Sequence, residues 1–520
     1  MLRPTKTIEV NPLMNSFTLN PIFSDNMVLQ REKPIKIWGE SSVKNTITVS
    51  IAGHTTTIRD VVGNWFAILP PLEATNECEV TVSSSNPSDE TIIIKKVAIG
   101  EVWIAGGQSN MEFSLKYDTD TKESISTSDN PLIRFFDCPK IAYEEQRNLD
   151  DFSEFGIWRP CNPINAPYYS AVGYYFAKEI YKSQQVPVGI IGCNWGGTSA
   201  SAWLDESYLA ADKDLIVYLE EYNQAIKGQN IEEYEKAVEA ERLFKNSPLE
   251  KKLFDALMTG VSPEEMNIFS INDMPPFPPM GPKSFNRPAG LFHTMVKKIS
   301  GYSARGVIWY QGESDDVKAN IYDKLFEAVI RCWRETWQDE LSFLFVQLAP
   351  FESWLETTGR DFPIVREKQE VVSKRLAKVY MASIMDVGMR YDIHPKNKRT
   401  VGERLSLLAR GKVYGENIIC ESPEIEKIKR EKDSIIIEFR NVGDEFILKG
   451  NSINGLQVLV EEREITAFNE AVEENRICIN SKEIDENSKV EIRFAYTPYV
   501  EVNLYSSVGL SVKPFRLILE

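Results

Sequence analysis

Ser109 and His394 are the residues of this sequence whose types and surroundings suit nucleophilic chemistry. The run VWIAGG at residues 102–107 is apolar and ends in two glycines, and Ser109 follows in a polar turn. This pattern is typical of a buried strand that delivers a hydroxyl to the carboxyl end of a sheet. Such a hydroxyl becomes a nucleophile when a general base removes its proton. An imidazole can do so near neutral pH, so the predicted chemistry is acyl transfer.

The scarcity of histidine narrows the choice of base. The chain has three histidines, at positions 54, 293 and 394. His54 lies in a turn of a region with β-strand character, where no chemical role is expected. His293 follows an insertion and could line the substrate pocket or simply be a hydrogen-bonded helical residue. Pro395 favours an extended backbone at His394, which places the predicted base on a loop.

The oxyanion formed by acyl transfer needs preorganised hydrogen-bond donors. We expect the backbone N–H groups of Ser109 and Gly197 and the side-chain amide of Gln311 to supply them, because each follows a predicted strand. Loss of one such donor typically costs about 2.7 to 4 kcal/mol of transition-state stabilisation. Cys193 could be a rival thiol nucleophile, but it ends a buried strand, where cysteine is more often part of the core.

Composition excludes several other functions. The chain has 520 residues, 76 acidic and 59 basic side chains and a net charge of -17, which disfavours nucleic-acid binding. No apolar run approaches the roughly 18 residues of a membrane span. Seven scattered cysteines and three histidines match neither a disulfide framework nor a metal cluster, so no metal or cofactor is expected.

The N-terminal sequence MLRPTKTIEVNPLMN has no apolar core of signal-peptide length. We therefore expect a cytoplasmic protein, or a secreted or periplasmic one from which a signal peptide has been removed. The sequence leaves the oligomeric state open.

Three regions are expected along the chain. Residues 1–99 show short alternating apolar runs, which favour a β-sandwich, and residues 416–520 return to that pattern. Residues 100–415 alternate strands with helices and predict a parallel sheet in a three-layer α/β/α sandwich. The expected strands are at 102–105, 132–135, 188–191, 306–310, 343–348 and 379–385, and the expected helices at 170–181, 322–337 and 362–376.

An insertion at about 205–288 interrupts this alternation. It is helical and highly charged at first and proline-rich at its end. A segment of this length exceeds a simple crossover connection. It could form a wall over the site, or it could be a solvated helical pair with a rigid return.

Four motifs resemble those of a known family. They are GQSNM at 107–111, NWGGT at 194–198, WYQGES at 309–314 and IHPKNK at 393–398. They resemble the SGNH hydrolases, specifically the sialate O-acetylesterase group, and IFSDNMVLQ at 22–30 and NLY at 503–505 extend the likeness over nearly the whole chain. The resemblance implies a flavodoxin-like SGNH fold and a metal-independent serine esterase that removes O-acetyl groups from sugars. Its nucleophile would be Ser109 and its base His394.

The residue that orients His394 is not settled by the motif. Many SGNH hydrolases carry an aspartate three residues before the histidine, and here that position is Tyr391. Asp392 is the first choice, Asp386 the second, and a backbone carbonyl could serve in a Ser/His dyad. Supporting or pocket-lining roles are expected for six residues near the motifs, which are Gln108, Asn110, Trp195, Tyr310, Glu313 and Asp386. Trp195 and Tyr310 could stack on a sugar.

The favoured function is hydrolysis of O-acetyl groups from sialic acid. An alternative is an acetylesterase for plant polysaccharide such as xylan or xyloglucan, and a more distant one is a non-catalytic carbohydrate-binding protein. A site for sialic acid needs a cation for the sugar carboxylate, and Arg390 and Arg287 are the candidates.

Overall fold

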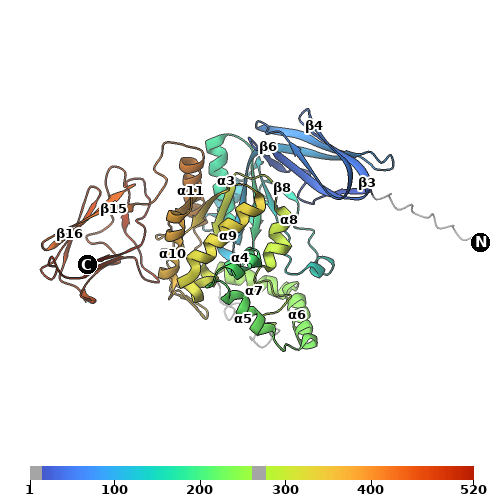
Figure 1. Cartoon of the computed structure of the whole chain (residues 1–520). Helices are drawn as coiled ribbons and strands as arrows, with labels where there is room; N and C mark the ends of the chain where they lie inside the picture. Colours follow the sequence, from blue (N-terminus) through green and yellow to red (C-terminus); the bar gives the residue numbers. More distant parts are fainter. Residues whose placement is uncertain (1–14, 261–276) are drawn as a thin grey trace, which may run out of the picture.

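The computed structural model describes residues 15–260 and 277–520. The N-terminal segment that bears on a signal peptide, and residues 261–276 of the insertion, lie outside the described residues. Figure 1 shows an N-terminal β-region, a central α/β region and a C-terminal β-region along the chain. Within the described ranges, no helix combines the length and the apolar character needed to cross a bilayer.

The central region is built on six parallel strands in the order β7-β9-β6-β10-β11-β14. Their bounds are β6 (Ile92–Gly107), β7 (Asn130–Asp137), β9 (Val188–Asn194), β10 (Gly306–Tyr310), β11 (Ser342–Val346) and β14 (Val379–Ala382). The short strand β8 (Trp158–Cys161) pairs antiparallel with β7. The inner strands β9 and β10 are buried at every residue, as expected for strands covered on both faces.

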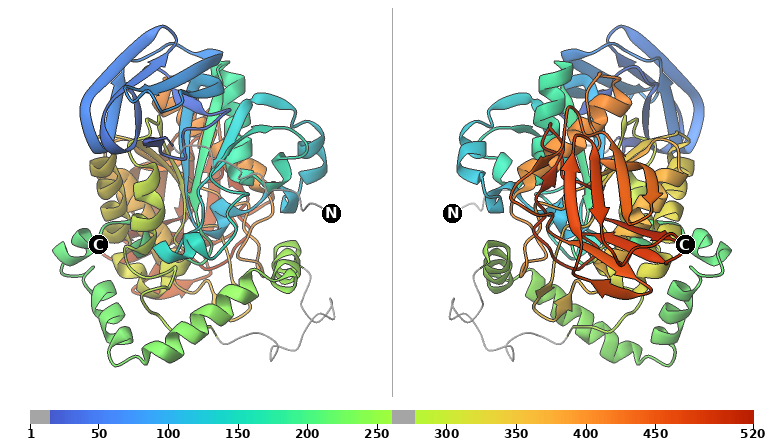
Figure 2. Two further views of the ribbon diagram at one scale, coloured as in Figure 1. Left: turned by 90° about the vertical axis from the view of Figure 1, so that its right-hand side faces the viewer. Right: turned by 90° about the vertical axis from the view of Figure 1, so that its left-hand side faces the viewer.

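Helices cover both faces of this sheet (Figure 2). One packed pair is α3 (Ala171–Gln184) with α11 (Lys398–Leu408), and the other is α9 (Tyr322–Trp337) with α10 (Phe362–Arg375). The short helices α1 (Ser109–Glu112), α2 (Thr121–Ser126) and α8 (Lys297–Ile299) lie in the connections. A mixed α/β fold with a parallel sheet is therefore confirmed.

The N-terminal strands form one curled sheet, which corrects the predicted sandwich (Figure 2). Its strands are β1 (Phe17–Leu19), β2 (Val28–Gln30), β3 (Ile35–Ile51), β4 (His54–Leu69), β5 (Thr75–Ser84) and the first half of β6. Because β5 pairs antiparallel with residues 92–99 of β6, this sheet is continuous with the central one. The boundary predicted at residue 99 falls inside β6, and the division into three domains stays a prediction.

The C-terminal region contains two four-stranded antiparallel sheets around an apolar core of their own. One has the order β15-β16-β21-β20 and the other β19-β18-β22-β24. Their strands are β15 (Glu424–Glu431), β16 (Ser434–Arg440), β18 (Leu456–Val460), β19 (Arg463–Ile465), β20 (Asn469–Glu473), β21 (Arg476–Asn480), β22 (Val490–Phe494) and β24 (Phe515–Leu519). Two-residue strands form two further pairs, β12 (Ser353–Trp354) with β13 (Thr357–Thr358) and β17 (Ile447–Leu448) with β23 (Leu504–Tyr505).

The described part of the insertion consists of four helices, α4 (Glu206–Ala211), α5 (Val217–Ile226), α6 (Ile231–Lys245) and α7 (Pro248–Thr259). They lie at the end of the central sheet opposite the N-terminal strands (Figures 1 and 2). The carboxyl end of β6 therefore faces the insertion.

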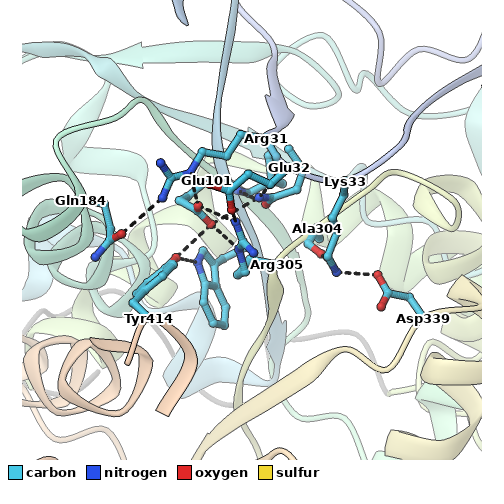
Figure 3. A network of polar contacts seen from close by, with 12 residues as sticks. Arg31, Glu32, Lys33, Glu101, Gln184, Ala304, Arg305, Asp339 and Tyr414 are labelled. Atoms are coloured by element: carbon cyan, nitrogen blue, oxygen red, sulfur yellow. Dashed lines mark hydrogen bonds and ion pairs between the residues drawn. The ribbon is translucent and has the colours of Figure 1, made fainter. Parts of the chain in front are cut away.

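Glu101 joins three parts of the chain in the middle of β6 (Figure 3). Its fully buried carboxylate accepts hydrogen bonds from Arg31 Nε at 2.6 Å and Arg305 Nε at 2.8 Å, and from the Tyr414 hydroxyl at 3.0 Å. Burial raises the pKa of Glu101, but the two guanidinium groups outweigh it and hold the pKa below its usual value. The carboxylate is thus ionised and fully paired.

We predict that Glu101→Gln lowers the free energy of unfolding by about 3 kcal/mol, because two partly buried guanidinium groups lose their shared counterion. Urea unfolding followed by tryptophan fluorescence measures this loss. Glu462→Gln is the matched control, because Glu462 is exposed and pairs with Lys489 at the surface. Equal unfolding free energies for Glu101→Gln and the wild type would contradict the structural role of this carboxylate.

Candidate active site

A sharp turn brings Ser109 to the end of β6. Gly107 has φ +131, a region that L side chains rarely adopt, and a Cβ there would lie 2.1 Å from the carbonyl oxygen of Tyr310. The next N–H, of Gln108, donates to that same carbonyl at 3.0 Å. Ser109 then opens α1, in the first turn of which backbone N–H groups have no intrahelical acceptor.

The structure brings Ser109 and His394 together. His394 Nε2 lies 2.9 Å from Ser109 Oγ, across 285 positions of sequence. The imidazole is 3% exposed and is held between the Phe113 ring, stacked at 6.4 Å, and the Trp354 ring, edge-on at 5.2 Å. The ring is therefore fixed with one nitrogen on the serine hydroxyl.

Asp392 is the carboxylate nearest the other imidazole nitrogen. Its Oδ1 accepts the backbone N–H of His394 at 2.8 Å and lies 3.5 Å from His394 Nδ1. The 3.5 Å between His394 Nδ1 and Asp392 Oδ1 is too long for a well-formed hydrogen bond. Within the described residues Nδ1 therefore has no hydrogen-bond partner. Asp392 is thus adjacent to the imidazole without a tight bond to it.

The pKa values of this pair move in the direction that a general base requires. Burial lowers the pKa of His394, and Asp392 opposes that effect only in part. Burial raises the pKa of Asp392, but contacts with His394 and Lys396 outweigh it, so its pKa falls below the usual value. At neutral pH the imidazole is neutral and the carboxylate is ionised.

Asp386 is occupied elsewhere. Its two oxygens accept hydrogen bonds from the Arg404 guanidinium at 2.6 and 2.8 Å. In the described part of the chain it forms no hydrogen bond or ion pair with His394. Of the two candidate carboxylates, the geometry therefore favours Asp392 as the orienting group.

Gln311 does not offer the amide expected for an oxyanion. The side chain is fully buried, and its Nε2 donates to Thr198 O at 3.2 Å and to Asp315 Oδ2 at 2.5 Å. Its Oε1 accepts the Tyr322 hydroxyl at 2.9 Å. Because both amide hydrogens are already donated, Gln311 braces the turn after β10 in this arrangement.

The glycine turn after β9 lies against Ser109. A Cβ on Gly196 would be 3.2 Å from Ser109 Cβ, whereas a Cβ on Gly197 would have no described heavy atom within 4 Å. Its N–H donates to Glu112 Oε2 at 2.7 Å. Gly197 is exposed with φ +72, and no acceptor for its N–H is found among the described residues.

A buried polar cluster behind Ser109 includes a residue that the sequence did not single out. Asn110 Nδ2 donates to Glu313 Oε1 at 2.6 Å and to Ile393 O at 3.0 Å, and Lys398 Nζ donates to Asn110 Oδ1. Burial raises the pKa of Glu313 and lowers that of Lys398 to about 7. The cluster ties the serine turn to the histidine loop. The available signal was the position of Lys398 inside the IHPKNK motif.

The predicted sugar-stacking rings differ in exposure. Tyr310 is fully buried, so it cannot stack on a sugar, which corrects that expectation. Trp195 is partly buried and stacks on Phe285 at 5.3 Å. Gln108 supports the neighbouring turn through its Nε2, which donates to the Ser314 hydroxyl at 3.3 Å.

His293 and Cys193 lie outside this constellation. Cys193 is buried in β9 as a free cysteine. His293 Nε2 lies 2.7 Å from Glu206 Oε2 near the surface, and Asp205 is close enough for the three to share a metal ion. Lys297 Nζ lies 3.2 Å from the other ring nitrogen, so a cation already balances this acidic group.

Helix α7 of the insertion contacts the active-site loops. Met258 O accepts a hydrogen bond from Lys396 Nζ at 2.6 Å, two residues after His394. Asp255 accepts from Lys116 Nζ at 2.8 Å. Of the two expected roles for the insertion, these contacts favour a wall beside the site.

Comparisons with known proteins agree with the motifs. Residues 281–408 match the family described as carbohydrate esterase, sialic acid-specific acetylesterase. The chain is 26% identical to the sialate O-acetylesterase of Rattus norvegicus, over 78% of this chain and 76% of the relative. It is also 26% identical to that of Homo sapiens, over 79% and 74%.

A solved structure is also similar to this chain. The crystal structure of a carbohydrate acetylesterase from Xanthomonas citri has a TM-score of 0.73 and 27% identity, covering 96% of this chain and 99% of that one. These similarities identify the chain as an ester hydrolase. More particularly, they confirm the resemblance to the sialate O-acetylesterases that the motifs predicted.

We predict that kcat/KM for an aryl ester falls on the acid side with a midpoint below pH 6.5, because the lowered pKa keeps His394 unprotonated to lower pH. Asp392→Asn removes a negative charge that stabilises the imidazolium, so it should move the midpoint further down. A pH–rate profile measures both. Asp386→Asn is the control and should leave the midpoint unchanged. A midpoint that moves in Asp386→Asn and not in Asp392→Asn would contradict the assignment of Asp392 as the orienting carboxylate.

Proposed function

We propose that this chain is a serine O-acetylesterase that removes acetyl groups from carbohydrate. The observation that carries the proposal is the 2.9 Å contact between Ser109 Oγ and His394 Nε2 at the carboxyl end of a parallel sheet. A neutral imidazole in hydrogen-bond reach of a serine is the arrangement that activates a hydroxyl. We also assign the central region to the SGNH type of α/β/α sandwich, on its motifs and its parallel strand order.

In the proposed mechanism His394 Nε2 takes the Ser109 proton as Oγ attacks the acetyl carbon. Collapse of the tetrahedral intermediate gives an acetyl-enzyme, and His394 returns the proton to the departing sugar oxygen. Water, deprotonated by the same nitrogen, then releases acetate and restores Ser109. Asp392 stabilises the imidazolium that exists between the proton transfers.

The oxyanion would be stabilised by backbone amides. The N–H of Ser109 lies in the first turn of α1, and the N–H of Gly197 lies in the glycine turn beside it. Gln311 would act indirectly, by holding the Thr198 carbonyl and hence the shape of that turn. Fixed amide dipoles of this kind stabilise the developing charge without reorganisation.

We predict that Ser109→Ala lowers kcat for release of acetate from an aryl acetate by at least about 10³-fold, because among the described residues Ser109 carries the hydroxyl that contacts the imidazole of His394. Acetate release and covalent labelling by a serine-reactive phosphonate measure the effect. Ser126→Ala, on an exposed helix, is the control and should retain both. Wild-type turnover in Ser109→Ala would end this proposal.

Two substrate classes follow from different observations. The names of the family and of the mammalian relatives support acetylated sialic acid. A neutral acetylated plant polysaccharide is the second candidate, because neither proposed carboxylate-binding arginine is free. Arg390 pairs with Glu352 at 2.5 Å, and Arg287 donates to the carbonyls of Ala142 and Ser284.

We predict that an acetylated sialoside competes successfully with an acetylated xylo-oligosaccharide present at the same acetyl concentration. Chromatography of the two deacetylated products in one reaction gives the ratio of their kcat/KM values. Faster deacetylation of the xylo-oligosaccharide would instead establish the neutral polysaccharide as substrate.

A further inference from the structure

An open cavity of about 730 Å³ lies beside the Ser109 turn. It is bordered by the carboxyl ends of β7 and β9 on one side and by α7 of the insertion on the other. A volume of this size falls within the range of small-molecule binding sites. Its lining includes Glu112, Asp137, Tyr168, Asn194 and Phe254.

The cavity adjoins the proposed nucleophile. Glu112 closes α1, the helix that Ser109 opens. Glu112 Oε2 and Ser109 Cβ both lie within 3.3 Å of the position that a Cβ on Gly196 would take. Asn194, another lining residue, pairs in register with Gly107 at the end of β6. A substrate whose acetyl group is at Ser109 could therefore extend into this space.

Asp137 is an unpaired carboxylate of the cavity among the described residues. It ends β7 beside Gly192, and a Cβ at that glycine would lie 2.5 Å from Asp137 Oδ1, so the absence of a side chain makes room for the carboxylate. No hydrogen-bond donor to this carboxylate is found in residues 15–260 and 277–520. Burial raises the pKa of Asp137 to about 6, with Lys140 and Arg159 opposing the effect. At neutral pH it is mainly an ionised acceptor.

The basic residues of the cavity are mostly paired with acids. Lys140 pairs with Glu112, Lys116 with Asp255 at 2.8 Å, and Arg159 with Glu154 at 3.1 Å. A fourth base, Lys251, is exposed on α7. An ionised Asp137 among paired bases repels a carboxylate ligand and accepts hydrogen bonds from hydroxyl groups.

Aromatic rings supply the apolar part of the lining. Tyr168 is 67% exposed and Phe254 is 38% exposed, although both are large apolar side chains. Pockets that bind small molecules usually combine such rings with a few polar groups that fix orientation. Flat rings beside a hydrogen-bond acceptor match the two surfaces of a sugar, its C–H face and its hydroxyls.

We propose that this cavity is a subsite for neutral, hydroxyl-bearing sugar residues linked to the acetylated one, with Asp137 accepting their hydroxyl groups and Tyr168 packing on a ring face. The inference deepens the proposed function and rests on it. It assigns substrate selection to Asp137 at the end of β7 and to Tyr168, away from the bond that is broken.

The test compares a substrate that fills the cavity with one that does not. For the first, O-acetylated sialyllactose or acetylated xylo-oligosaccharide is used, whichever the wild type deacetylates faster, since both carry neutral sugar residues. An aryl acetate is the second. Asp137→Asn should lower kcat/KM for the oligosaccharide by about 10-fold or more, mainly through KM, as expected for a lost hydrogen bond to a charged group. The aryl acetate should be hydrolysed within about twofold of the wild-type rate.

Tyr168→Ala provides a second variant, because its exposed ring contributes little to the core, and it should show the same split. Asp151→Asn, an exposed carboxylate outside the lining, is the control and should leave both substrates unchanged. Equal losses on both substrates, or an unchanged oligosaccharide kcat/KM in Asp137→Asn, would overturn the subsite.

A binding measurement separates failure of the subsite from failure of the proposed function. Lactose and xylotriose carry no acetyl group, so calorimetric titration of either into Ser109→Ala requires no catalysis. Adding Asp137→Asn to that variant should weaken binding of the tighter of the two by about 10-fold. No binding of either sugar overturns the subsite whatever the esterase activity, whereas binding without acetate release in the wild type overturns the esterase proposal alone.

Discussion

The ion-paired carboxylate of Glu101 is the contact on which the arrangement of this protein depends. It lies in the strand that the N-terminal and central sheets share, and it requires both Arg31 and Arg305 to remain ionised while buried. These contacts fix the strand a few residues before it ends at Gly107. The first half of β6 therefore joins the N-terminal sheet to the central one, and the end of the strand presents the proposed nucleophile.

The sequence predicts the central region well because its signals are local. The strand at 306–310 and the helix at 322–337 are found with the predicted bounds as β10 and α9. Burial on both faces makes the strand an unbroken apolar run, and a strong helical period marks the helix. The meeting of Ser109 with His394 follows from the rule that sites form at the carboxyl ends of parallel strands.

Predictions that depend on pairing or burial were less successful. The short apolar runs expected in residues 1–99 include parts of one long strand, β3, in which register shifts between Ser41 and Ile47 interrupt the alternation. The curled N-terminal sheet was predicted as a sandwich, since periodicity shows which face is buried but not which strand lies opposite. Gln311 has its amide occupied by Asp315, four residues later, and such a contact cannot be read from strand position. Lys398 is buried, against the usual preference of lysine for the surface.

The shared strand also affects how the protein loses its structure. The apolar core of the curled sheet is continuous with that of the central sheet, whereas the C-terminal sheets enclose a separate core. Calorimetry should therefore resolve an endotherm for the C-terminal part from one for the rest of the chain. Amide hydrogens along both halves of β6 should exchange with deuterium together, because neither half can open without the other.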